Sequence, residues 1–139
     1  MDYYIDYSVV WRSMSSLFYG LGIDIYMTLA SVALGSLIGL VVAFALVSER
    51  KIFRVLSSTY VAIIRNVPLL IIVLFIYFGL PDVGFVFSEI PSFIFALTVY
   101  AGAYVAEVFR GGILAIPKGV GEAGMAIGMS NLQIIVFIK

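Results

Sequence analysis

The stretch that decides the fold runs from Ile25 to Ser48 and reads IYMTLASVALGSLIGLVVAFALVS. Its 24 residues carry no formal charge. As a helix with a rise of about 1.5 Å per residue it would be about 36 Å long, which exceeds the hydrocarbon core of a bilayer, roughly 30 Å. The stretch therefore predicts a transmembrane helix, with a span over about 23–48.

A second uncharged run and the composition point to the same class of protein. Residues 90–106 are 17 residues without a formal charge, and they predict a span over about 90–110. Hydrophobic residues make up 63% of the 139 residues and charged residues 12%, whereas a soluble domain has roughly 45–50% and 25%. The sequence therefore predicts an all-α membrane protein.

The stretch between these two runs is a less regular candidate for a third span. Residues 57–80 are largely apolar, but they contain Arg65 and Pro68. Proline lacks a backbone donor and clashes with the preceding helical turn, so a bend or an unwound turn is expected at residues 64–67. Because broken helices occur where a cavity or a translocation route runs, Arg65 is a candidate for a substrate path. A snorkelling arginine beside a proline is the alternative.

Composition also bears on the class of function. The eight basic and eight acidic residues cancel, so the chain lacks the charge with which proteins bind nucleic acid. It contains neither cysteine nor histidine, which removes disulfides and the usual ligands and general bases of metal and triad chemistry. We therefore expect no catalytic residue, metal or resident cofactor, and the chain is not predicted to be an enzyme.

The placement of charges predicts how the spans are oriented. Segment 49–56 after the first span contains three basic residues, whereas segment 81–89 after the second contains none. Basic residues concentrate in cytoplasmic loops. Residues 49–56 and the C-terminal tail are therefore predicted to lie on the cytoplasmic side of the membrane. The N-terminus and residues 81–89 are predicted to lie outside. Six of the eight basic residues are then on the inner side.

Three segments follow from this topology. Residues 1–20 form an external segment. Within it, residues 9–19 are either a short interfacial helix, because Trp and Tyr favour the headgroup level, or the beginning of the first span. Residues 21–110 form the transmembrane domain with its three spans, and residues 111–139 form a cytoplasmic tail.

Small residues mark one face of the first span. Gly35, Gly39 and Ala43 recur at a spacing of four residues, which places them on one side of a helix. Small residues at such positions let a neighbouring helix approach closely. We therefore predict a packed face at Gly35 and Gly39. The alternative is that glycine is simply common in membrane helices.

A polar face is predicted on the third span. Tyr100, Tyr104, Glu107 and Gly111 have the spacing of one helical face, and Arg110 can reach Glu107 three residues away. Ionisable groups at membrane depth usually face a bundle interior or a water-filled path. Tyr104 and Glu107 are therefore candidates for a substrate path. In the alternative, Glu107 and Arg110 pair or snorkel at the cytoplasmic interface.

The tail predicts two short helices. Six glycines occur between residues 111 and 128, but the G-K-[ST] ending of a phosphate-binding loop is absent. Pro117 separates the tail from the third span. Residues 119–127 are predicted to form a helix that ends at Gly128, after which Ser130 can cap a second helix. An exposed apolar helix of this kind usually serves as a docking surface.

The tail also carries a resemblance to a known family. Glu122, Ala123 and Gly124, followed by Gly128 and then Ile138, resemble the EAA loop of ATP-binding cassette (ABC) importer permeases. The family pattern is E-A-A, three residues, G, nine residues and I-x-L-P, so Gly124 replaces the second alanine. The runs TLASVALGSLIGL, YVAIIRNVPLL and AYVAEVFRGGILAIPKG are similar to the polar amino-acid uptake branch of this family.

The resemblance implies a fold, a function and partners. The fold would be three transmembrane helices of a permease bundle followed by a short cytoplasmic coupling helix, in a bacterial inner-membrane protein. The function would be translocation of a polar amino acid, with ATP bound and hydrolysed by a partner subunit. The partners would be this cytoplasmic ABC subunit, an extracytoplasmic amino-acid-binding protein, a second permease subunit and membrane lipid. Glu122, Ala123, Gly124 and Gly128 would couple the permease to the ATPase.

Two other classes of function stay open on the sequence. One is a small helical membrane protein that binds partners without transport activity. The other is a secondary carrier or channel, against which the lack of an internal repeat argues. Because the chain stops at Lys139, where Leu-Pro would follow in the family pattern, we also expect a truncated permease that does not transport alone.

Overall fold

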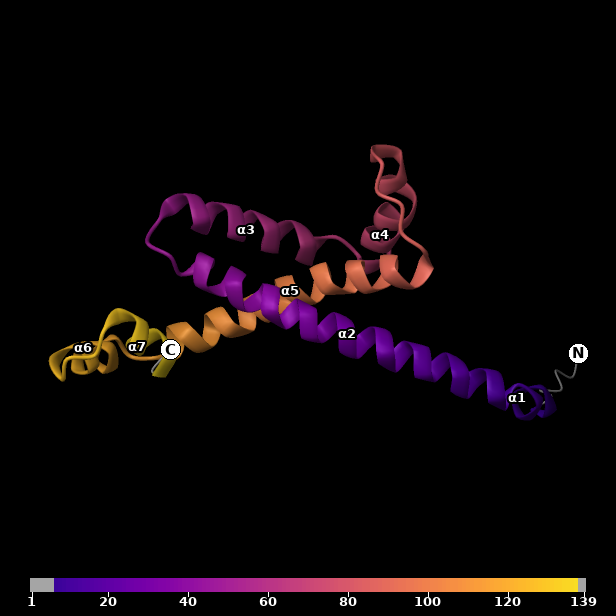
Figure 1. The fold of residues 1–139 in the computed structure, drawn as a ribbon, viewed down its shortest axis with the longest axis horizontal. Coiled ribbons are helices and arrows are strands. Elements are labelled where there is room, and N and C mark those ends of the chain that lie inside the picture. Colours follow the sequence, from indigo (N-terminus) through magenta and orange to yellow (C-terminus); the bar gives the residue numbers. More distant parts are fainter. Residues whose placement is uncertain (1–6, 138–139) are drawn as a thin grey trace, which may run out of the picture.

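The computed structural model describes residues 7–137, and within this range the chain is helical, without strands. Two long helices, α2 (Met14–Leu46) and α5 (Glu89–Ala115), cross each other and form the body of the molecule (Figure 1). Both are long and apolar enough to cross a membrane. The uncharged runs of the sequence therefore correspond to the two long helices.

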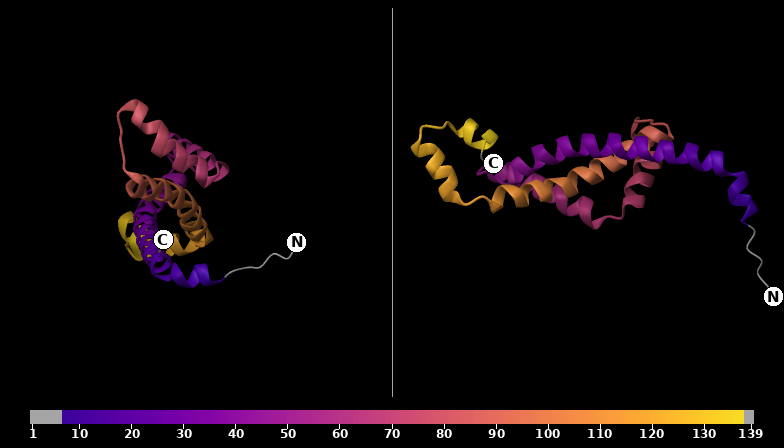
Figure 2. Two further views of the ribbon diagram at one scale, coloured as in Figure 1. Left: turned by 90° about the vertical axis from the view of Figure 1, so that its right-hand side faces the viewer. Right: turned by 90° about the horizontal axis from the view of Figure 1, so that it is seen from below.

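The N-terminal segment is divided between α2 and a short helix before it. The long helix begins at Met14, so residues 14–19 belong to it. The interfacial position expected for residues 9–19 stays a prediction, as does its alternative. A short α1 (Ser8–Arg12) comes before it, and Figure 2 shows α1 bent away from the axis of α2. Residues 1–6, and Ile138 of the EAA pattern, lie outside the described residues.

The segment between α2 and α5 is a broken helix. It consists of α3 (Lys51–Asn66), α4 (Leu69–Leu74), a π-helical turn (Phe75–Gly79) and a 3-10 turn (Leu80–Val83). The part before Val67 and the part after Pro68 are bent by 105°. Figure 1 shows α4 pointing away from α2 and α5. A break is therefore present beside Pro68, but it lies at Val67 and Pro68, whereas residues 64–66 remain in α3. The pair is one bent span or a re-entrant loop.

The middle of the chain becomes helical earlier than expected. The expected loop over 49–56 was wrong for residues 51–56, because α3 begins at Lys51. The membrane span over 57–80 stays a prediction. Residues 51–66 contain neither glycine nor proline, so nothing stops a helix that starts directly after the turn. The described residues thus hold two spanning helices, or three if the bent pair counts as one span.

The face of α2 that carries its small residues lies against α5. A Cβ atom added at Gly35 would lie 2.8 Å from the Cβ of Ala101, and one added at Gly39 would lie 2.9 Å from the Cβ of Val105. Ala43 is fully buried. Because these positions lack larger side chains, the two helix backbones come close together.

Tyr60 fixes α3 on α5. Its hydroxyl donates a hydrogen bond of 2.6 Å to the carbonyl oxygen of Val99. Gly102 leaves the room that this contact needs, since a Cβ there would lie 3.1 Å from the hydroxyl oxygen of Tyr60. This contact sets the distance between the two helices that form the site described below.

The tail forms two short helices, α6 (Lys118–Ala126) and α7 (Asn131–Phe137). Gly128 has φ +85°, and its N–H donates to the carbonyl of Met125 while the N–H of Met129 donates to Gly124, both at 3.0 Å. This is a Schellman ending, for which glycine is the preferred residue. Ser130 then starts α7 with a reciprocal pair of hydrogen bonds to Gln133.

Candidate functional site

A groove between α3 and α5 contains the three residues predicted for a substrate path. Arg65 comes from α3, and Tyr104 and Glu107 come from α5. The groove has a volume of about 420 Å³, within the range of small-molecule sites, about 300–1,000 Å³. The remaining lining residues all belong to α3 and are Ser58, Val61, Ala62 and Asn66.

Arg65 provides the positive charge of the groove. Its guanidinium carbon lies 5.2 Å from the ring centre of Tyr104, close enough for a cation–π interaction. Tyr104 in turn accepts a hydrogen bond of 3.0 Å from the hydroxyl of Tyr100, and the two rings lie 4.7 Å apart. Among the described residues, no carboxylate lies within 4.0 Å of Arg65. The arginine is therefore oriented by an aromatic ring and keeps its charge unpaired.

Glu107 provides the negative charge. The Nε and Nη2 atoms of Arg110 both donate to its Oε2 atom, at 3.0 and 2.7 Å. Neither of these bonds involves Oε1. Glu107 thus pairs with Arg110 and also lines the groove, and its place on a substrate path stays a prediction. The groove brings a cation and an anion from different helices to one site.

Sequence analysis missed the polar residues that α3 contributes. Ser58 and Asn66 line the groove, and the side-chain nitrogen of Asn66 donates to the carbonyl of Ala62 at 2.7 Å. The signal that could have located them is helical spacing. Residues 58, 62, 65 and 66 follow one another at i, i+4, i+7 and i+8 and so share a face of α3.

The four residues predicted for coupling lie apart from the groove. Glu122 and Ala123 are exposed on α6, whereas Gly124 is buried and Gly128 ends the helix. None of them lines the groove. Figure 1 shows α6 beyond the C-terminal end of α5, toward the same end of the molecule as the turn from α2 to α3.

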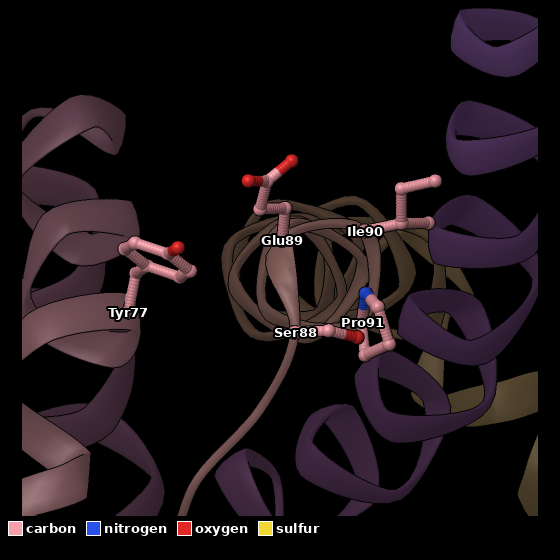
Figure 3. A pocket seen from close by; sticks show the side chains of 5 residues that line it. All are labelled: Tyr77, Ser88, Glu89, Ile90 and Pro91. Atoms are coloured by element: carbon pink, nitrogen blue, oxygen red, sulfur yellow. The ribbon is translucent and has the colours of Figure 1, made fainter.

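A second pocket lies at the beginning of α5. It has a volume of about 440 Å³ and is lined by Tyr77, Ser88, Glu89, Ile90 and Pro91. Figure 3 shows the ring of Tyr77 extending toward the beginning of α5, while Ile90 extends toward α2. No basic residue lines this pocket, so it cannot offer the paired charges of the groove.

Two apolar helices that cross at small residues, a broken third helix and a polar groove define a helical membrane protein with a solute-sized site. The chain belongs to the family of binding-protein-dependent transport system inner membrane components, whose model matches residues 35–138. It is accordingly an inner-membrane protein.

Named relatives of this chain are amino-acid permeases. It is 32% identical to the glutamine transport system permease protein GlnP of Escherichia coli (strain K12), over 96% of this chain and 62% of that one. It is 35% identical to the L-cystine transport system permease protein TcyB of Bacillus subtilis (strain 168), over 81% of this chain and 48% of that one. The chain thus spans between about half and three-fifths of the length of these two relatives.

Two solved structures share this fold. One is a crystal structure of an amino acid ABC transporter with histidines, with a TM-score of 0.82 and 31% identity, covering 94% of this chain and 61% of that one. The other is an inward-facing MetNI methionine ABC transporter, with a TM-score of 0.76 and 29% identity, covering 91% of this chain and 62% of that one. Both of these neighbours are ABC transporters.

Proposed function

We propose that this chain forms a membrane-spanning part of an ABC importer permease, and that this permease moves a polar amino acid across the cytoplasmic membrane. Membership of the family supports this, as do the glutamine and cystine permeases among its relatives. The chain takes no catalytic role in the proposal. A partner subunit binds and hydrolyses the ATP.

The groove between α3 and α5 is the observation that carries the proposal. A free α-amino acid has a carboxylate and an ammonium group. Arg65 offers several N–H donors to the carboxylate, because its charge is unpaired among the described residues. The Oε1 atom of Glu107 offers an acceptor to the ammonium group. Opposite charges on two helices thus suit a zwitterionic solute.

The tail is proposed to transmit the movement of the ATPase to the spans. On α6 the side chain of Met125 is 55% exposed, and Ile127 directly after the helix is 80% exposed, which suits docking into a groove of a protein partner. Glu122 and Ala123 are exposed on the same helix. Gly128 fixes the angle at which the chain leaves it.

The orientation and the partners follow from the same proposal. The basic turn between α2 and α3 and the tail lie toward one end of the molecule, and α1 toward the other (Figure 1). With the basic end inside, the N-terminus lies outside. An extracytoplasmic binding protein then delivers the amino acid at the outer end, and a second permease subunit completes the path.

Uptake of labelled amino acids tests this function. The complete reading frame that contains the chain is expressed with its ATPase and binding protein, and uptake is compared with Arg65→Gln and Glu107→Gln variants. Loss of a hydrogen bond to a charged group costs about 1.5–3 kcal/mol, so each variant should lower uptake efficiency by about tenfold to a hundredfold. Arg12→Gln, outside the groove, is the matched control.

Other outcomes would contradict the proposal. Uptake that persists without the ATPase and follows an ion gradient would identify a secondary carrier. Membrane insertion and partner binding without any uptake would identify an interaction protein. Full uptake by both groove variants would contradict binding of the solute in the groove, but it would not contradict the importer function itself.

A further inference from the structure

Three basic residues at the turn from α2 to α3 belong neither to the groove nor to the coupling tail proposed above. Arg50, Lys51 and Arg54 are all exposed, and we call them the basic cluster. Among the side chains that the structure describes, the ion pair of Arg110 with Glu107 is the one case of a basic group within 4.0 Å of a carboxylate, and Arg50, Lys51 and Arg54 are not part of it. The neighbouring Glu49 therefore does not neutralise the cluster.

The local structure holds two of these cations near each other. The backbone N–H of Arg54 donates to the carbonyl of Arg50 at 3.3 Å, which places them one helical turn apart. The Nη1 atom of Arg54 reaches back to the carbonyl of Ser48 at 3.5 Å. The guanidinium carbon of Arg50 lies 6.0 Å from the ring centre of Phe53. Both guanidinium groups thus stay beside the turn.

Apolar side chains surround the cluster. α2, whose surface is apolar, ends at Leu46, shortly before Arg50. After the turn, Ile52 is 66% exposed and Leu56 is 63% exposed. Exposed cations beside exposed apolar side chains, at the end of a membrane-spanning helix, are typical of the interface where headgroups meet acyl chains.

We propose that the basic cluster binds the phosphate of an anionic phospholipid. Arginine suits phosphate because its guanidinium offers a planar pair of donors. The net charge of residues 49–54 is positive, with three basic residues and Glu49, so a net negative headgroup is favoured over a zwitterionic one. The acyl chains of the lipid cover Ile52 and Leu56.

These apolar neighbours favour a lipid over other partners. Inorganic phosphate shares the headgroup chemistry but would leave Ile52 and Leu56 in water. An acidic protein surface could pair with the cations. Ile52 and Leu56 follow the end of the apolar helix α2 by six and ten residues, however, and this closeness to a membrane-spanning helix favours a lipid.

Lipid titration of the purified protein in detergent tests the proposal. Native mass spectrometry counts bound phosphatidylglycerol, phosphatidylcholine or inorganic phosphate at increasing concentration. Each basic residue near an anionic surface is worth about a fivefold change in affinity. The double variant Arg50→Gln/Arg54→Gln should therefore bind phosphatidylglycerol about 30-fold more weakly. Arg12→Gln removes one charge elsewhere and should change affinity less than twofold.

Two further measurements keep the test independent of folding of the double variant. Arg50→Lys/Arg54→Lys keeps both charges and should retain most of the affinity. Binding to the unaltered protein should weaken as salt rises, since salt screens exposed charges. Equal affinity for phosphatidylglycerol and phosphatidylcholine, or for inorganic phosphate, would overturn the proposal. Cross-linking of residue 54 to a protein partner instead of lipid in membranes would overturn it as well.

Discussion

Replacing Gly35 by alanine tests the close approach of α2 and α5 on which the fold depends. The new Cβ would lie 2.8 Å from the Cβ of Ala101, and 3.1 Å from both the backbone nitrogen of Gly102 and the carbonyl oxygen of Thr98. Two of these three atoms belong to the backbone of α5 and cannot rotate away. The helices would have to separate by a few tenths of an ångström.

A control in the same helix isolates the cost of this clash. Overpacking of a packed interface costs about 1–3 kcal/mol, whereas alanine in place of glycine stabilises a helix by roughly 0.5–1 kcal/mol. Gly20 also lies in α2, and a Cβ there would have nothing within 4 Å. The gain in helix propensity is common to both variants, so Gly35→Ala should be less stable than Gly20→Ala by about 1–3 kcal/mol.

Unfolding of the purified protein provides the measurement. Helicity is followed by circular dichroism while denaturing detergent is added to mixed micelles, and the free energies of unfolding are compared. Gly39→Ala should behave like Gly35→Ala, because its Cβ would lie 3.0 Å from the backbone nitrogen of Ala106. Equal stability of Gly35→Ala and Gly20→Ala would refute the contact between the two helices.

Three further substitutions test the tail, the orientation and the seating of α3. Gly128→Val places a branched side chain at φ +85°, which costs roughly 1–2 kcal/mol. It should reduce uptake while the protein stays in the membrane, and unchanged uptake would argue against a coupling role. Single cysteines at Asp82 and Lys51 should react with an impermeant reagent on intact cells at position 82 alone, and the opposite pattern would reverse the topology. Tyr60→Phe removes the hydrogen bond to Val99 and should lower the unfolding free energy by about 1 kcal/mol; no change would show that this bond does not hold α3.

The elements that sequence predicted well have causes in neighbouring residues. Uncharged runs are enough to locate α2 and α5, because crossing a bilayer requires length and apolarity alone. Pro68 breaks the middle helix through its own ring. Gly128 ends α6 through its own backbone angle.

The features that sequence could not provide depend on contacts between distant residues. The hydrogen bond from Tyr60 to Val99 joins positions 39 residues apart, and no local sequence pattern predicts it. The bend of 105° likewise brings α4 into contact with α5, whereas Pro68 indicates only where the bend occurs. The groove arises from the packing of α3 on α5, and for this reason its residues could be proposed singly but not as one site.

The state of Glu107 shows how the groove can hold a carboxylate inside a membrane protein and still keep it available. A buried charge without a partner is costly, and Arg110 provides this partner through two hydrogen bonds to the single oxygen Oε2. The pair is partly exposed, with 25% of the Glu107 side chain accessible, so its net contribution to stability is small, about 0–1 kcal/mol. An ammonium group can therefore bind Oε1 without first breaking the pair. On this argument Arg110 orients Glu107, and in the proposed function Arg65 takes the opposite charge of the solute.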